Sequence, residues 1–361
     1  MRIMMLTRYG QMGANSRYRL LQYIPRLESA GHQVEVRPML DDAYLAALYS
    51  TGRRNPMEVA RGYIRRAAHL HGLNKYDIVL CDQEFFPYFP VAAELLAASR
   101  CARLIVDYDD AAYFKYRHIP MLRNRIPELM GSAEAVVVGN RHLRDFASRH
   151  NRNVHVIPTV VDLARYTAKQ DYSVPQGVRL AWIGTPVTAA FLKPLAPVLA
   201  ELKAKYGNLQ LRLIGADRGL CGELPFAEVL SWAEASEARL LAECDIGIMP
   251  LPDTEFTRGK CGLKLIQCMA AGLPVVASPV GANCDIIGEG RDGFLADGPE
   301  EWYQALERLI VSETLRRELG RNGAVTARER YSLERGFSAW MRLINSDFRS
   351  RQTALTGPPR S

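Results

Sequence analysis

The stretch from Arg258 to Gly281, RGKCGLKLIQCMAAGLPVVASPVG, has a cationic start and an apolar end. Its first seven residues hold three cations, Arg258, Lys260 and Lys264. The order of residue types predicts a helix, a turn marked by glycine and proline, and a buried strand, as in α/β proteins. Cations beside a helix N-terminus favour an anionic ligand, because the helix dipole and the free amide groups there already attract negative charge.

The same alternation of short apolar runs and helical stretches continues along the chain, which predicts βαβ units in two parallel sheets. In such sheets ligands bind beyond the carboxyl ends of the strands. The runs expected to form strands are 2–7, 33–39, 77–82, 103–110 and 135–140 in the first half, and 179–184, 209–215, 246–251 and 274–280 in the second.

A chain of 361 residues suits two domains. We expect a first domain over residues 1–162, a polar linker over 163–177 and a second domain over 178–340. Residues 341–361 are expected to end the last helix, return toward the first domain and finish in a disordered tail.

The composition, with 48% hydrophobic and 24% charged residues, is that of a globular protein. No apolar run approaches the roughly 18 residues of a membrane span, and the start lacks a signal-peptide pattern. Seven cysteines without a CxxC pair predict reduced thiols, with no metal site and no cofactor. We therefore expect a cytoplasmic protein.

The positive charge is concentrated in the first half. Residues 1–165 hold 23 Lys and Arg against 16 Asp and Glu, a net charge of +7, and residues 166–361 hold 23 against 23. This asymmetry favours an anionic partner for the first half. An anionic membrane surface is preferred to nucleic acid, because no nucleic-acid-binding motif is present.

A second anion-binding feature is expected after the run 179–184. Gly184 ends this run, and Thr185 or Thr188 can cap the helix that follows. Lys260 and Lys264 are four residues apart and are expected to share one helical face, where two ammonium groups would balance a diphosphate. The alternative is a basic helix end in water.

Residues 262–296, GLKLIQCMAAGLPVVASPVGANCDIIGEGRDGFLA, resemble the donor-binding segment of the retaining, nucleotide-sugar-dependent glycosyltransferases with the GT-B fold. The pattern of that family is E-G-F-G-L-x-L-L-E-A-M-A-x-G-x-P-V-V-A, followed by a glycine-rich turn. Residues 156–166, VIPTVVDLARY, and 328–340, RERYSLERGFSAW, are similar to its interdomain segment and closing helix. The resemblance implies an α/β fold with two Rossmann-like domains whose parallel sheets face each other across a deep cleft.

The resemblance also implies a reaction, the transfer of a sugar from a nucleotide-diphosphate sugar to an acceptor hydroxyl with retention of configuration and without a metal. The expected role is in surface polysaccharide or glycoconjugate assembly. The acceptor would be a sugar or a polyprenyl-diphosphate-linked sugar, and the protein would work in the cytoplasm or on the inner face of the membrane. Two alternatives are a nucleotide-sugar epimerase or hydrolase on the same fold and a non-catalytic nucleotide-sugar binder.

The sequence departs from the family pattern at four positions. The two glutamates of the pattern, which contact the donor sugar and ribose, correspond to Gly259 and Gln267. An Arg and a Lys of the family correspond to Thr185 and Ala190. Lys260 and Lys264 can supply the missing charge. The residues expected to bind the donor are Gly184, Thr185, Thr188, Gly215, Trp232, Pro250, Arg258, Gly259, Lys260, Cys261, Gly262, Leu263, Lys264 and Gln267.

Three donor-site residues have specific expected roles. Lys260 and Lys264 are the expected catalytic cations, because they would stabilise the departing diphosphate. Trp232 either stacks on the base or belongs to the core.

The first half supplies the expected acceptor site. Gly13, Asn15 and Arg17 follow the first strand, and Glu84 follows the third. Asp109 and Asp110 follow the fourth strand, where they are expected to orient or deprotonate the acceptor hydroxyl, with repulsion raising the pKa of one carboxyl. The alternative is that they cap the next helix.

A basic helix is expected after Asn55, which can act as its N-cap. Its apolar positions Met57, Ala60, Ile64 and Ala67 form one stripe, and Arg54, Arg61 and Arg65 form another. Such a helix would lie on an anionic membrane. The alternative is a helix docked on the sheet with its arginines in water.

Overall fold

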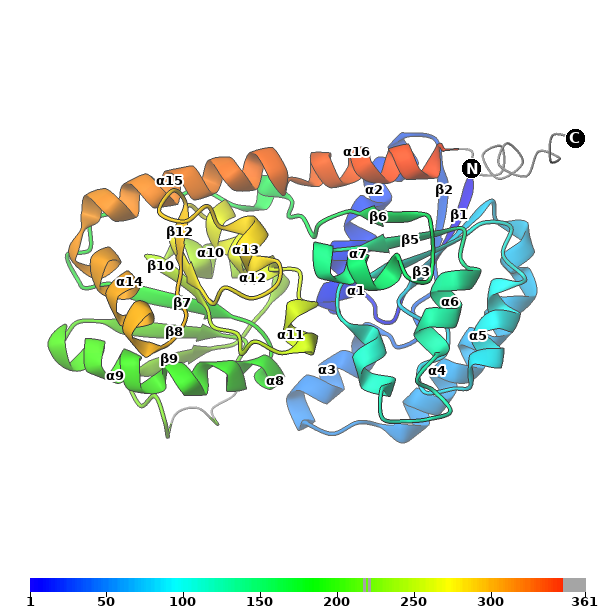
Figure 1. Ribbon diagram of the computed structural model, residues 1–361, viewed down its shortest axis with the longest axis horizontal. Helices are drawn as coiled ribbons and strands as arrows, with labels where there is room; N and C mark the ends of the chain where they lie inside the picture. Colours follow the sequence, from blue (N-terminus) through cyan, green and yellow to red (C-terminus); the bar gives the residue numbers. More distant parts are fainter. Residues whose placement is uncertain (217–218, 220–221, 347–361) are drawn as a thin grey trace, which may run out of the picture. The chain divides into compact units, whose positions relative to one another are not determined.

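The computed structural model describes residues 1–216, 219 and 222–346. The chain forms two compact units (Figure 1). Of the described residues, the first holds 1–139, 143–157 and 334–346, and the second holds 140–142 and 158–333 apart from the gaps named above. The segment expected as a linker, 163–177, thus lies inside the second unit, and residues 334–340 lie in the first. Residues 347–361, which include the expected disordered tail, lie outside the described part.

The first unit contains a six-stranded parallel sheet in the order β2-β1-β3-β4-β5-β6. Strands β3 to β5 are buried throughout, since each is covered on both faces. The strands are β1 (Arg2–Leu6), β2 (Gln33–Val36), β3 (Ile78–Asp82), β4 (Leu104–Tyr108), β5 (Ala135–Val138) and β6 (Val154–Val156).

Helices connect these strands as the sequence pattern predicts. They are α1 (Ala14–Arg19), α2 (Ile24–Ser29), α3 (Asp42–Thr51), α4 (Pro56–His69), α5 (Val91–Ala98), α6 (Arg125–Ser132) and α7 (Arg141–Ala147). A 3-10 helix, η3 (Ala112–Tyr116), follows β4.

The second unit contains another six-stranded parallel sheet, in the order β12-β11-β10-β7-β8-β9. Its strands are β7 (Arg179–Ile183), β8 (Gln210–Ile214), β9 (Ala227–Leu230), β10 (Ile246–Met249), β11 (Val275–Ala277) and β12 (Gly293–Leu295). Its helices are α8 (Pro186–Ala189), α9 (Ala196–Lys205), α10 (Glu234–Ala242), α11 (Glu255–Arg258), α12 (Leu263–Ala270), α13 (Asn283–Ile286), α14 (Pro299–Val311) and α15 (Glu313–Arg330).

The strand orders define which loops lie next to one another. In the first unit β3 lies between β1 and β4, and in the second β7 lies between β10 and β8. Since all pairs are parallel, the loops that follow neighbouring strands leave the same edge of the sheet. The order changes direction beside β1 and β7, where open α/β sheets bind ligands.

The last helix, α16 (Leu333–Ile344), packs on the first unit beside α2 (Figure 1). Trp340 is buried, and its ring centroid lies 6.3 Å from that of Tyr23. Glu334 pairs with Arg26 at 2.5 Å, and Arg103 donates hydrogen bonds to the carbonyls of Ile344 and Ser346. The end of the described chain is therefore fixed to the unit that contains its start.

Candidate functional site

Lys264 lies in the first turn of α12, where its ammonium group meets residues that follow or belong to β7. Nζ donates a hydrogen bond to Oγ1 of Thr188 at 3.1 Å and lies 4.0 Å from the centroid of the Trp182 ring. Gly184 makes room for it, because a Cβ at that position would lie 2.4 Å from Nζ. The ammonium group is thus held at the carboxyl end of β7 by a hydroxyl and an aromatic ring.

The electrostatic environment of Lys264 is unfavourable to its charge. Burial, and then repulsion from Lys260, lower the pKa of Lys264 from 10.5 to about 7. Among the described residues no carboxylate pairs with Nζ. A bound anion would favour the charged form and raise this pKa again. Groups perturbed in this way are concentrated at functional sites.

Lys260 lies in the loop between α11 and α12. The prediction that Lys260 and Lys264 share one helical face is wrong, because Gly262 adopts a left-handed conformation with φ of 69° and separates the two helices. Nζ of Lys260 lies 4.5 Å from the Phe256 ring centroid. The two lysines still interact, as the lowered pKa of Lys264 shows.

The third cation of the stretch, Arg258, has its own counter-ion. Its Nε and Nη2 atoms donate hydrogen bonds to the two carboxylate oxygens of Asp253 at 2.6 and 2.7 Å, on the exposed surface. The neighbouring positions Gly259 and Cys261 are buried. Arg258 therefore differs from Lys264, which has no carboxylate partner among the described residues.

Thr185 is the N-cap residue of α8, as expected, and forms a capping box with Thr188. The backbone amide of Thr185 donates to Oγ1 of Thr188 at 3.2 Å. The same Oγ1 accepts the hydrogen bond from Lys264, so the cap also positions the lysine contact. Since α8 has only four residues, its dipole adds little to anion binding.

Trp232 follows β9 and is partly buried. Its Nε1 donates a hydrogen bond to Oε2 of Glu237 at 2.8 Å. Gly215 lies beside it, at the end of β8, with its amide bonded to the carbonyl of Leu230 at 2.8 Å. Part of the preceding loop, residues 217–218 and 220–221, lies outside the described residues.

Gln267 and Tyr166 extend this group of polar side chains. Nε2 of Gln267 donates a hydrogen bond to the hydroxyl of Tyr166 at 3.2 Å, and that hydroxyl lies 3.4 Å from Oε1 of Glu237. Gln267 and Glu237 are both buried. A chain of hydrogen bonds therefore joins two predicted donor-site residues, Gln267 and Trp232, through two residues that the prediction did not include.

In the first unit, the loop after β1 is tied to the end of β3. Nδ2 of Asn15 lies 3.2 Å from Oδ1 of Asp82, and Oγ of Ser16 donates to Oδ2 at 2.6 Å. The backbone amide of Arg8 donates to the same oxygen at 3.1 Å. Gly13 packs on Tyr9 in this loop. Asp82, which was not among the predicted site residues, thus accepts the hydrogen bonds that fix the loop after β1.

The two arginines of α1 are buried. Arg17 donates a hydrogen bond from Nη1 to the carbonyl of Gln11 at 2.9 Å, and it is only 3% exposed, so it supports the loop from within. Arg19 forms a buried ion pair with Asp107, at 2.6 and 2.9 Å. The expectation that Arg17 approaches a ligand is not supported by this burial.

Glu84 is part of a buried ionic cluster. Its carboxylate lies 3.1 Å from Nη2 of Arg125 and accepts a hydrogen bond from the hydroxyl of Tyr116 at 2.8 Å. Arg8 and Lys115 lie 3.8 and 3.7 Å away. These groups compensate the negative charge of Glu84. We therefore assign Glu84 a structural role in place of the predicted role in the acceptor site.

Asp109 is partly exposed and lies next to this cluster. Its Oδ1 accepts a hydrogen bond at 2.9 Å from Nε2 of Gln83, whose Oε1 lies 3.4 Å from Nζ of Lys115. Neither Asp109 nor Asp110 caps η3, since its N-cap is Ala111 and no side chain caps it. The helix-cap alternative is therefore wrong.

Two carboxyls at this edge, those of Asp82 and Asp107, have raised pKa values. Burial, followed by repulsion from Asp109, raises the pKa of Asp82 to about 6. Burial raises the pKa of Asp107 as well, and repulsion from Asp109 adds to it, so the repulsion between carboxylates acts both at the end of β4 and across to β3.

Residues 178–312 match the family model described as Glycosyl transferases group 1. HepE from Anabaena, solved with UDP, superposes with a TM-score of 0.70 over 96% of this chain and 100% of its own, at 16% identity. Sucrose-phosphate synthase from Thermosynechococcus elongatus gives 0.69 over 98% and 99%, at 15% identity. The chain has the GT-B fold, and residues 178–312 are similar to the group 1 glycosyl transferases.

Curated relatives of this GT-B protein include D-inositol 3-phosphate glycosyltransferases. The one from Geodermatophilus obscurus is 29% identical over 223 residues, which is 54% of this chain and 48% of the relative. The one from an Arthrobacter species is 35% identical over 218 residues, 54% of this chain and 49% of the relative. The matched part thus spans about half the length of these relatives.

Three further features of the described residues concern membrane-spanning helices, metal-binding clusters and disulfides. None of the helices there is both long and apolar enough to span a lipid bilayer. No group of three or more His, Cys, Asp or Glu side chains is arranged to hold a metal ion in that part of the chain. The six cysteines it contains are free thiols.

Proposed function

We propose that the protein is a glycosyltransferase that uses a nucleotide-diphosphate sugar, with the donor bound by the second unit. The observation that carries the proposal is the position of Lys264. Its ammonium group is partly buried at the carboxyl end of β7, has a pKa of about 7 and lacks a paired carboxylate among the described residues. A diphosphate provides the missing negative charge.

The two lysines would stabilise the leaving group of the reaction. When the glycosidic bond of the donor breaks, negative charge develops on the diphosphate. Lys264 and Lys260 lie where this charge would be compensated, so the chemistry we propose needs no metal. In the retaining reaction implied by the resemblance, an oxygen of the departing diphosphate takes the proton of the acceptor hydroxyl.

The nucleoside would bind near Gln267 and Trp232. The amide of Gln267 replaces a family glutamate and is oriented by Tyr166. Trp232 is oriented by its hydrogen bond to Glu237, and we propose that its indole stacks on the base. UDP is the first nucleotide to test, because HepE is described in complex with UDP and with UDP-glucose.

The acceptor hydroxyl would bind to the first unit at Asp109, which is partly exposed and held by Gln83. We propose an acceptor sugar, free or linked to polyprenyl diphosphate, and a role in surface polysaccharide or glycoconjugate assembly. The relatives named above make inositol 3-phosphate a further acceptor to test.

Helix α4 supports a place at the inner face of the membrane. Asn55 caps it, as predicted, by accepting hydrogen bonds from the amides of Met57 and Glu58. The apolar stripe faces solvent, since Met57 is 62% and Ile64 is 69% exposed. The apolar stripe therefore does not dock on the sheet, although Arg61 and Arg65 are exposed as that alternative expects. Gly62 and Arg66 are buried instead.

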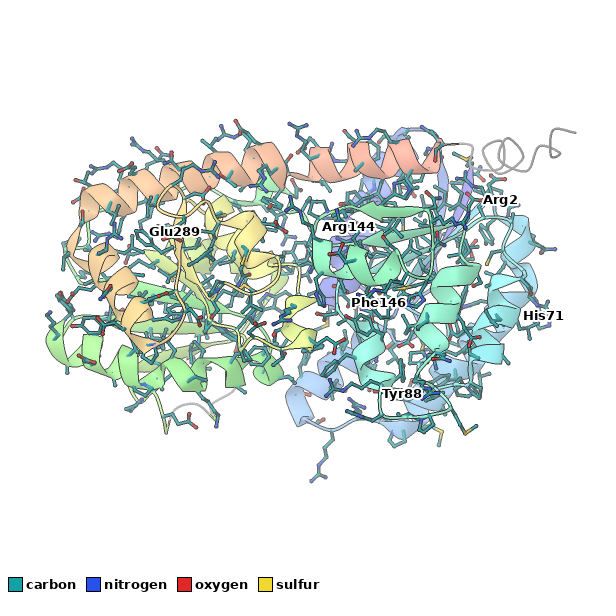
Figure 2. The ribbon with its side chains drawn as sticks, viewed as in Figure 1. Arg2, His71, Tyr88, Arg144, Phe146 and Glu289 are labelled. Carbon is teal, nitrogen blue, oxygen red and sulfur yellow. The ribbon has the colours of Figure 1, made fainter. Side chains whose placement is uncertain are left out.

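The exposed face of α4 combines apolar and basic side chains, which suits an anionic lipid surface. Arg61 and Arg65 are 61% and 43% exposed at the side chain, although Arg61 pairs with Glu58 at 2.5 Å. Tyr88, near the lower edge of the first unit in Figure 2, adds a further exposed aromatic ring. We propose that this face brings the protein to its membrane-linked acceptor.

Donor turnover tests the proposal. Purified protein is incubated with UDP-glucose and other nucleotide sugars, with and without candidate acceptors, and nucleotide release and product anomers are measured. A glycosyltransferase consumes donor mainly when an acceptor is added. Consumption of the donor without an acceptor would indicate a hydrolase or epimerase. Tight binding without turnover would indicate a non-catalytic nucleotide-sugar binder, the alternative suggested by Gly259, which has no carboxylate. The absence of binding to every nucleotide sugar would contradict the proposal.

A further inference from the structure

Asp82 is buried at the carboxyl end of β3, and it accepts hydrogen bonds from three groups of the loop and helix that follow β1. Oγ of Ser16 donates to Oδ2 at 2.6 Å, and the backbone amide of Arg8 donates to the same oxygen at 3.1 Å. Nδ2 of Asn15 lies 3.2 Å from Oδ1. The carboxyl is only 2% exposed, so it acts on a ligand only through these neighbours.

The hydrogen bonds of Ser16 fix the direction of its bond to Asp82. Its Oγ also accepts a hydrogen bond from the backbone amide of Tyr9 at 3.2 Å, so its own hydrogen is committed to Asp82. Only an ionised carboxylate accepts all these bonds without competition from its own proton. A proton on Oδ1 would displace Asn15, and a proton on Oδ2 would displace Ser16 or Arg8.

A second carboxylate holds the other part of the loop. Oδ2 and Oδ1 of Asp42 accept hydrogen bonds from the amides of Gln11 and Met12, at 3.2 and 2.8 Å. Asp42 lies near the surface, where water can replace these contacts. The buried contacts to Asp82 are therefore the ones that depend on a single side chain.

We propose that Asp82 is a positioning residue whose ionised carboxylate holds residues 8–16 in the conformation that receives the acceptor, and that its protonation releases this loop. The inference rests on the proposed function only in calling the loop acceptor-binding.

The environment of Asp82 sets its pKa within the pH range in which a protein can be studied. Burial, then repulsion from Asp109, and more weakly from Asp107, raise the pKa of Asp82 to about 6, while the bonds from Ser16 and Arg8 oppose this rise. The other charged or titratable groups near it are Arg8 beyond β1, Arg66 on α4 and the neighbouring thiol of Cys81. The loop is thus held at pH 7.5 and loosened near pH 5.

Hydrogen exchange tests this proposal without any substrate. Exchange of the peptides covering residues 8–16 is measured on the full chain at pH 7.5 and pH 5.0, with correction for the intrinsic rates. We expect protection in this segment to fall about tenfold at pH 5.0 in the wild type, because charge-assisted bonds become neutral ones. In Asp82→Asn the protection should be the same at both pH values.

Asp77→Asn is the matched control. Asp77 precedes the same strand and accepts a hydrogen bond from the backbone amide of Arg2 at 2.6 Å, at the opposite end of β1. This variant should keep the wild-type pH dependence over residues 8–16. Ser16→Ala removes a bond that lowers the pKa of Asp82, so it should move the midpoint of the loss to higher pH.

A turnover assay then separates this inference from the proposed function. If a substrate pair is found, the wild-type kcat should fall as the pH is lowered, with a midpoint near pH 6. Asp82→Asn should be less active and should not show this pH dependence. If exchange shows the transition but no glycosyl transfer is found, only the proposed function fails. Unchanged protection between pH 7.5 and 5.0 in the wild type, or a retained pH dependence in Asp82→Asn, would overturn the role of Asp82.

Discussion

The carboxyl edges of the two sheets differ in how the charge of their buried cations is compensated. In the second unit, Lys264 is partly buried beside a hydroxyl and an aromatic ring, and its pKa is lowered to about 7. In the first unit two buried arginines are neutralised by carboxylates, Arg19 by Asp107 and Arg125 by Glu84. One edge therefore has an unsatisfied positive charge that a diphosphate would balance, and the other is suited to a neutral hydroxyl.

The largest expected effect comes from removing both lysines of the second unit. Lys260→Ala/Lys264→Ala should weaken nucleotide-diphosphate binding by about a hundredfold or more, since each charge-assisted bond is worth about 1.5 to 3 kcal/mol. Calorimetry with UDP measures this affinity. Lys205→Ala, which removes an exposed lysine paired with Glu307, is the matched control and should bind normally. An affinity of the double variant within twofold of wild type would contradict the difference between the two edges.

The second effect contrasts two aspartates of the same strand end. Asp109→Asn should reduce kcat by about a hundredfold, a magnitude typical of acid–base and positioning groups, with donor affinity unchanged. Asp107→Asn should instead destabilise the fold by about 3 to 5 kcal/mol, because it leaves Arg19 buried without its partner. Kinetics and chemical unfolding of both variants separate the roles. Equal losses of stability and activity in Asp109→Asn would show that it too is structural.

These contrasts also show what the sequence could predict. The nine strands expected from apolar runs are present, and the family resemblance located the donor-binding segment. Strand β9, with the sequence AEVL, was missed because it lacks an apolar run, and β12 has only three residues. Both lie at the edges of the second sheet, where less burial is required of the side chains.

The polar residues were harder to assign. Asp82 is the last residue of the third apolar run and Glu84 follows it, and only Glu84 was expected to be functional. In the structure Glu84 contacts Arg125 and Tyr116, whereas Asp82 contacts the loop after β1, and we propose a role for Asp82 on that ground. Asp82 and Ser16 are 66 residues apart in the chain, so no local pattern indicates the contact. Likewise, the four-residue spacing of Lys260 and Lys264 predicted one helix for both, but the left-handed conformation of Gly262 separates them.

The third effect is a pH dependence of donor binding. Because the free protein has a pKa of about 7 at Lys264 and an anion favours its charged form, affinity should rise as the pH falls. Between pH 8.5 and pH 6 the protonated fraction increases about thirtyfold for such a group, which sets the upper limit of the change. Calorimetry with UDP over this range is the measurement. Lys264→Met should bind weakly at every pH, and a wild-type affinity that does not vary would contradict the unsatisfied charge.

The smallest effect concerns the surface of the first unit. Changing Arg54, Arg61 and Arg65 to glutamine should weaken binding to anionic lipid vesicles at least tenfold, since each cation contributes on the order of 1 kcal/mol near such a surface. Ile64→Ser should weaken it as well, because the apolar stripe is exposed. Sedimentation with vesicles measures binding. Changing Arg308, Arg321 and Arg328 of the second unit to glutamine removes the same charge and should have little effect; failure of the wild type to sediment at low salt would contradict the membrane role.

The ionisation of Lys264 is the central quantity of this account, and NMR of lysine side chains labelled at Cε measures it directly. The signal is assigned with Lys264→Met, and its titration is followed in the free protein and with saturating UDP. We expect a pKa of about 7 in the free protein and a rise of at least two pH units when the diphosphate binds, since the opposite charge favours the ammonium form. A pKa near 10.5 in the free protein, or a value that UDP leaves unchanged, would contradict the claim that this lysine is held for the diphosphate of the donor.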